Sequence, residues 1–187
     1  MAHGQVEALR ALQPHGPYSL LGFSLGGAVV VEMARRLIDA GEAVEFVGMI
    51  DTHASWACLT WGERLRQAAR LPSRWRRTAT SDLVRTVRLI RGRFMTPPPS
   101  SGVKWDRHTV QLAAGNRRAL RRYRPRRLDA SIVYFEVAVP TLFQADATVL
   151  WKRLARNVRV RSLPGNHAQL LHEHLADLGR AISDELP

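Results

Sequence analysis

Gly22-Phe23-Ser24-Leu25-Gly26-Gly27 joins two segments that differ in hydrophobic pattern. Residues 18–21 before it form a short apolar run, which is typical of a buried strand. Residues 28–40 after it repeat apolar side chains at the spacing of an amphipathic helix. The sequence therefore predicts a strand, a sharp turn and a helix, with Ser24 at the apex of the turn.

A Gly-x-Ser-x-Gly sequence between a strand and a helix is typical of the nucleophile elbow of α/β-hydrolases. We expect Gly22 and Gly26 to leave room for the turn and for close contact between strand and helix. The turn would hold the Ser24 hydroxyl above the edge of the sheet, beside the first amides of the helix, which favour developing negative charge. The alternative is a glycine-rich turn in which the serine is only structural.

An elbow serine predicts an acidic residue further along the chain. Asp51 directly follows residues 44–50, which read as a buried strand, and functional groups collect at the C-terminal ends of parallel strands. Asp51 could instead cap the following loop. Glu136 is a rival acid, because it ends the predicted strand 130–136.

A histidine should follow the acid in the chain. Residues 157–163 alternate as a strand and lead into Pro164-Gly165-Asn166-His167, before a helix expected from Ala168 onwards. His167 would thus lie on a loop from which an imidazole can reach the elbow. His53 lies on the wrong loop for this order.

Several segments resemble the thioesterase domains that end non-ribosomal peptide and polyketide synthases. They are residues 16–27, 32–37, Gly41, 49–51 and 163–167. In that family the acid ends the strand after the elbow helix, so the resemblance favours Asp51, 27 residues after Ser24. Asn166 is a departure, because these domains usually carry Asp before the histidine.

The resemblance implies an α/β fold with a partial parallel sheet of about four strands, and a serine thioesterase. Ser24 would be the nucleophile, Asp51 and His167 its partners, and the Leu25 amide an oxyanion donor. The implied substrate is an acyl or peptidyl chain on the phosphopantetheine of a carrier protein, released by hydrolysis or cyclisation, with no other cofactor or metal. The alternatives are a general serine esterase and a catalytically impaired remnant that acts as an interaction module.

The start of the chain departs from the family more strongly. Complete thioesterases of this kind carry a longer segment before the elbow strand than residues 1–17, and it supplies the second oxyanion-hole amide. Val6 to Leu12 is predicted to be the end of the helix that precedes the elbow strand. We therefore expect a single domain, residues 1–187, that is N-terminally incomplete, with an exposed sheet edge and the possibility that a partner chain supplies the missing part.

Composition agrees with one globular domain of 187 residues with 45% hydrophobic residues. The single cysteine, Cys58, excludes an internal disulfide and fits a reducing compartment. No signal-peptide pattern and no long apolar run are present. The expectation is a cytoplasmic protein without a membrane partner.

The chain carries a formal net charge of +12, and arginine supplies 26 of its 28 basic residues. Residues 56–127 concentrate this charge, with 18 arginines and Lys104 against three acidic residues. In the resembling family this region forms a helical lid, and helices are predicted at 57–71, 81–93 and 107–123. An arginine-rich lid would steer an acidic carrier protein and pair with its phosphate.

Clustered arginines with interspersed tryptophans also occur in nucleic-acid-binding proteins. This sequence has no helix-turn-helix, zinc or RNP pattern, so a nucleic-acid partner is not expected. His172-Glu173-His174 invites a metal site, but on the helix expected there, positions two apart do not share a face. A solvated C-terminal helix is the better interpretation.

Overall fold

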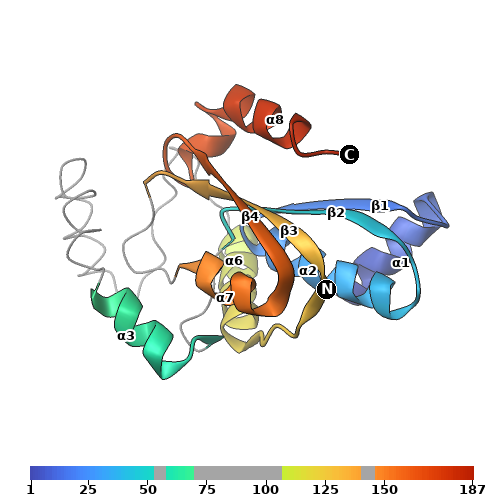
Figure 1. Ribbon diagram of the computed structural model, residues 1–187, viewed down its shortest axis with the longest axis horizontal. Helices are drawn as coiled ribbons and strands as arrows, with labels where there is room; N and C mark the ends of the chain where they lie inside the picture. The colour runs from blue at the N-terminus through green and yellow to red at the C-terminus, as the bar shows by residue number, and fades with distance from the viewer. Residues whose placement is uncertain (53–57, 70–106, 140–145) are drawn as a thin grey trace.

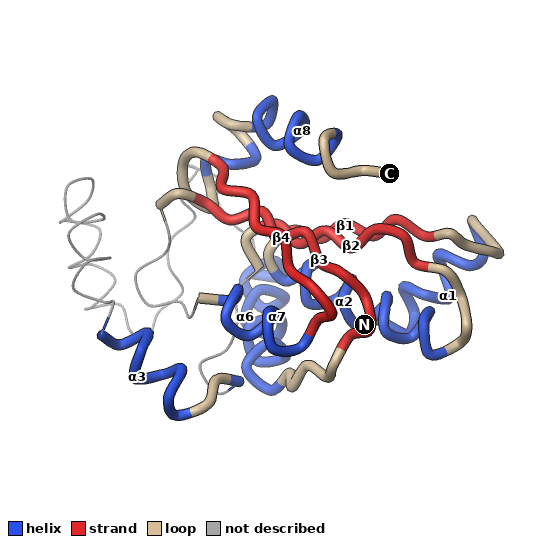
Figure 2. The backbone as a smooth tube through the Cα atoms, in the orientation of Figure 1, coloured by secondary structure: helices blue, strands red, loops and turns tan. Residues whose placement is uncertain are grey.

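The structure is a computed structural model that describes residues 1–52, 58–69, 107–139 and 146–187 (Figure 1). Its centre is a parallel sheet of four strands in the order β1-β2-β3-β4 (Figure 2). The strands are β1 (Tyr18–Phe23), β2 (Val44–Ile50), β3 (Leu128–Val137) and β4 (Ala155–Leu163). The predicted α/β class is confirmed, and all four predicted strands are found, the last two with extended ends.

Helices cover both faces of the sheet (Figure 1). On one face lie α1 (Ala2–Leu12), α2 (Leu25–Asp39), α6 (Arg107–Arg122) and α7 (Ala147–Leu154). On the other lies α8 (Leu175–Ser183), preceded by the short 3-10 helix η2 (Gln169–Leu171). A further helix, α3 (Trp61–Ala69), follows the second strand in the chain.

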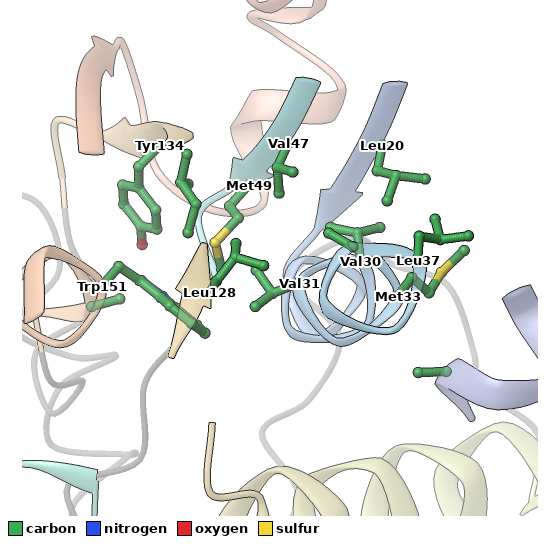
Figure 3. Packing of buried hydrophobic residues seen from close by; sticks show 14 of the residues in the cluster. Leu20, Val30, Val31, Met33, Leu37, Val47, Met49, Leu128, Tyr134 and Trp151 are labelled. Carbon is green, nitrogen blue, oxygen red and sulfur yellow. The ribbon is translucent and has the colours of Figure 1, made fainter. Parts of the chain in front are cut away.

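The larger core forms between the sheet and α2. Val30, Val31 and Met33 of α2 face Leu20 and the β2 side chains in a single apolar cluster (Figure 3). Leu37 is fully buried there, so the apolar spacing read from the sequence corresponds to the face that α2 buries. This packing fixes the start of α2 directly beyond the end of β1.

A second core lies on the opposite face. Phe135 of β3 packs there with Leu170 of η2 and Leu178 of α8, and all three are almost completely buried. The loop between β4 and α8 is thus tied to the sheet by buried apolar side chains. On the same face of β1, Leu21 remains 41% exposed, and β1 pairs only with β2 among the described residues.

The structure differs from the sequence predictions at two helices. The helix expected from Ala168 onwards is a 3-10 turn, a short irregular stretch and then α8, so His172-Glu173-His174 precedes α8 and does not lie on a helix. Helix α7 was not predicted. Asp146 caps it by accepting a hydrogen bond from the Thr148 amide, and Trp151 buries its apolar face.

The predicted lid, residues 56–127, lies partly outside the described residues, and the helix expected at 81–93 lies wholly outside them. The other two helices predicted there correspond to α3 and α6. Arginines 118, 121, 122, 124, 126 and 127 are exposed and lead into the start of β3. This part of the basic segment therefore lies at the edge where strands begin, opposite the edge that Ser24 follows.

No helix within the described residues is long and apolar enough to cross a membrane.

Candidate active site

Ser24 stands between β1 and α2 with φ of 55° and ψ of −119°. Side chains other than hydrogen are disfavoured at positive φ, so the backbone is strained at this residue. The Ser24 amide donates to the Ile50 carbonyl at 2.8 Å, which continues the ladder between β1 and β2. The sheet and the packed helix thus hold the turn sharp, as expected of a nucleophile elbow.

The glycines around Ser24 differ in the space they need. A Cβ on Gly22 would lie 2.3 Å from the Gly26 carbonyl oxygen, and one on Gly27 would lie 1.8 Å from Thr52 Oγ1. For Gly26 no described atom lies within 4 Å. The expectation for Gly22 is confirmed, whereas the close contact expected of Gly26 belongs to Gly27.

This difference predicts opposite results for two alanine substitutions. Gly22→Ala should lower the free energy of unfolding by at least about 2 kcal/mol, because the new methyl group meets rigid backbone. Gly26→Ala should leave it unchanged or raise it by up to about 1 kcal/mol, since alanine favours a helix over glycine. Urea unfolding of both variants measures the effect, and equal destabilisation would contradict the packing described.

Asp51 and His167 are 116 residues apart in the chain and meet at the edge where the strands end. Asp51 follows β2, and its amide donates to the Phe135 carbonyl of β3 at 2.8 Å. Its Oδ2 lies 2.5 Å from His167 Nδ1. Because a carboxylate only accepts, Nδ1 carries the proton, and Nε2 on the far side of the ring is then a proton acceptor.

The His167 ring also stacks on Phe23, with centroids 4.5 Å apart and ring planes 21° apart. Phe23 is the last residue of β1 and directly precedes Ser24. The stacking therefore places the imidazole beside the elbow. The Asp51 side chain is 12% exposed and that of His167 is 29% exposed, so the pair is sheltered but open on one side.

Buried groups hold the backbone directly after Asp51. The Tyr134 hydroxyl donates to the carbonyl oxygen of Thr52, the next residue, at 2.9 Å. Burial holds the pKa of Tyr134 well above its ordinary value, so this hydroxyl stays a neutral donor. Thr52 is fully buried and lies against Gly27. It therefore packs the chain that carries Asp51 against the start of α2.

The other candidates fall at different places. Leu25 is the first residue of α2, so its amide has no partner within the helix and lies at the helix end beside Ser24. Glu136 is the penultimate residue of β3. His53 lies outside the described residues. Within the described residues, no group of three or more His, Cys, Asp and Glu side chains could hold a metal ion.

Sequence reasoning missed Phe23, Thr52 and Tyr134. Phe23 occupies a variable position of the Gly-x-Ser-x-Gly pattern, and Tyr134 reads simply as a strand residue. Their roles depend on which strands are neighbours in the sheet, and the local sequence pattern does not show this.

A family model described as "Thioesterase domain" matches residues 1–186. The chain belongs to the thioesterase domain family. The predicted class of enzyme, a serine hydrolase that acts on thioesters, is therefore confirmed at the level of the family.

Relatives of this thioesterase domain include parts of much longer synthetases. It is 43% identical over 53 residues to N-(5-amino-5-carboxypentanoyl)-L-cysteinyl-D-valine synthase of Penicillium rubens, a match that covers 28% of the chain and 1% of that protein. It is 47% identical over 53 residues to the dimodular nonribosomal peptide synthase of Bacillus subtilis, covering 28% of the chain and 2% of that protein. The predicted resemblance to synthase-type thioesterase domains is confirmed.

Solved structures agree over nearly the whole chain. The NocB thioesterase domain from the nocardicin cluster superposes with a TM-score of 0.64 at 27% identity, covering 98% of this thioesterase domain and 71% of that chain. NocB in a covalent complex with a fluorophosphonate nocardicin G analog gives a TM-score of 0.66 at 26% identity. This match covers 100% of this thioesterase domain and 72% of that chain. The sheet and its helices are therefore those of this family.

Proposed function

We propose that the chain cleaves the thioester of a carrier-bound acyl or peptidyl chain through an acyl-serine intermediate. The observation that carries the proposal is the 2.5 Å contact between Asp51 and His167 beside the strained Ser24 turn. These are the three groups that a serine nucleophile, its base and the base's orienting acid require.

In the proposed mechanism, Ser24 Oγ attacks the thioester carbonyl and His167 Nε2 takes its proton. Asp51 accepts the Nδ1 proton, which fixes the tautomer and stabilises the imidazolium. The Leu25 amide donates to the oxyanion of the tetrahedral intermediate. The carbon–sulfur bond then breaks, and the protonated His167 returns a proton to the leaving thiolate.

The acyl-serine is resolved by a second nucleophile. His167 takes a proton from water or from a hydroxyl or amine of the bound chain, which attacks the acyl carbon. Water gives a free acid, and an internal nucleophile gives a ring. His167 then returns the proton to Ser24 Oγ, so the enzyme is regenerated.

The proposed partner is an acyl or peptidyl carrier protein, whose phosphopantetheine arm presents the thioester. Support comes from the synthases to which the chain is similar, one of which is a dimodular nonribosomal peptide synthase. The domain itself needs no further cofactor in this mechanism, because the chemistry uses only a hydroxyl, an imidazole, a carboxylate and an amide.

A fluorophosphonate probe followed by substrate comparison tests the proposal. We expect the probe to label Ser24 in the 187-residue chain, as mass spectrometry of the tryptic peptides would show, since NocB forms such a covalent complex. Hydrolysis of an acyl-pantetheine thioester should then exceed that of the matched oxygen ester. Both are measured as kcat/KM on the same preparation.

Each other outcome selects a different function. Absence of labelling in a folded chain would contradict the nucleophile and favour an interaction module. Labelling with a preference for oxygen esters would make the chain a general serine esterase. Loss of labelling in His167→Ala, with unchanged circular dichroism, is the matched control for specific activation of Ser24.

A further inference from the structure

The loop that carries His167 is closed by a reciprocal pair of side chains. Asn166 Oδ1 accepts hydrogen bonds from the backbone amides of Ala168 at 3.0 Å and Gln169 at 3.1 Å. In return, Gln169 Oε1 accepts from the Asn166 backbone amide at 3.1 Å. The arrangement is that of a capping box, and His167 lies inside it.

We infer that Asn166 and Gln169 are positioning residues that set the direction of the His167 ring. This inference rests on the proposed function for its kinetic consequence, but the geometry that it concerns is independent of the substrate. Both side chains would act through the position of His167 and not by contact with the reacting atoms.

Backbone hydrogen bonds flank the box on both sides. Gly165, directly before it, has φ of 76°, and the Gly165 carbonyl accepts from the Val139 amide at 3.0 Å. After it, the Leu170 amide donates to the Asn166 carbonyl at 3.1 Å. Asn166 thus caps a single helical turn, and His167 is the first residue after the cap. The box determines how that turn starts.

Two contacts of the His167 ring are made with other side chains. One is the hydrogen bond to Asp51 and the other is the stacking on Phe23. Neither fixes the backbone from which the ring extends. Without the box, rotation about the peptide units at 166–168 would swing the imidazole away while Leu170, which is fully buried, kept the end of the turn in place.

The chemistry of the box predicts which replacements are tolerated. Aspartate at 166 has a side chain of nearly the same length and keeps the oxygen acceptor, whereas alanine removes both bonds to the following amides. Gln169→Ala leaves both bonds to Asn166 Oδ1 and removes the bond from the Asn166 amide. Gln169 also donates to the exposed Glu173 at 3.0 Å. Glu173→Ala removes that outer contact and leaves the box intact.

Proton NMR of the chain labelled with ¹⁵N-histidine tests the inference directly. The wild type should show a low-field Nδ1–H resonance of His167, protected by the bond to Asp51. We expect Asn166→Ala to lose it through faster exchange with water, Gln169→Ala to weaken it, and both Asn166→Asp and Glu173→Ala to keep it. Circular dichroism should show all four variants folded, with Tm lowered by about 2–4 °C for Asn166→Ala.

The kinetic readout separates positioning from substrate binding. With an acyl-pantetheine thioester, kcat of Asn166→Ala should fall about 10- to 100-fold while KM changes less than about twofold, since misplacement of a catalytic group acts on the reaction step. Asn166→Asp should restore kcat to within about threefold, and Glu173→Ala should match the wild type.

The two proposals fail in different ways. A wild type without a protected Nδ1–H, an Asn166→Ala variant that keeps it, or an Asn166→Asp variant that loses it would overturn the positioning role. If the wild type has no thioesterase activity and Ser24 does not label, the proposed function fails, yet the NMR comparison still decides the role of the box. If Asn166→Ala does not fold, Gln169→Ala and Asn166→Asp carry the same comparison.

Discussion

Ser24→Ala is expected to abolish thioester hydrolysis, by at least about 10⁵-fold in kcat, because the proposed acyl intermediate forms on the Ser24 hydroxyl. Alanine removes one oxygen from a turn that the sheet ladder and the α2 core already hold. The free energy of unfolding should therefore stay within about 1 kcal/mol of the wild type. Single-turnover hydrolysis of a pantetheine thioester, with urea unfolding of the same sample, measures both quantities.

The matched control is Ser19→Ala, which removes a hydroxyl from the same strand at an exposed position, where it donates to Glu45. Activity of that variant should equal the wild type. Wild-type turnover by Ser24→Ala would exclude the acyl-serine mechanism outright, because the elbow would then supply no nucleophile.

Asp51→Asn should lower kcat by about 10⁴-fold. An asparagine amide can donate to His167 Nδ1, which places the ring proton on Nε2 and leaves no acceptor for the serine proton. Asp51 has φ of 39°, a conformation that asparagine tolerates well, so the backbone should not change. Steady-state hydrolysis of the thioester across a range of pH measures the loss.

Glu136→Gln is the matched control for this result, since it makes the same chemical change at the other candidate acid. We expect less than about a threefold change in kcat. The reverse ranking, with a large loss for Glu136→Gln and a small one for Asp51→Asn, would move the orienting acid to β3 and contradict the mechanism proposed above.

Local patterns in the sequence carry most of the sheet. Residues 44–50 form a strand with the predicted bounds, and the run at 18–21 forms a strand that continues to Phe23, because both apolar runs are bounded by turn residues and buried on the sheet. The order serine, acid, histidine then follows from where each residue stands relative to a strand end. Pairing of Asp51 with His167 was an expectation of this kind, and the two side chains do meet.

Other features depend on contacts that the local sequence does not specify. The helix expected after Ala168 is interrupted between η2 and α8, although Leu170 and Leu178 both reach the second core at a spacing that one continuous helix would also bring to a single face. The spacing Asn-x-x-Gln at 166–169 was a readable signal for a capping box, since it places an acceptor and a carboxamide three residues apart. Gly27 was not distinguishable from Gly26 without knowing that Thr52 packs against it.

At position 24, the residue that would give the higher thermal stability differs from the residue that the chemistry requires. With φ of 55°, position 24 suits glycine better than any residue with a side chain, and relief of such strain amounts to about 1–3 kcal/mol. Directed evolution that selected this chain only for resistance to heat would therefore enrich glycine at position 24 and discard the hydroxyl. A library screen for a more robust domain must include turnover as a criterion from its first round.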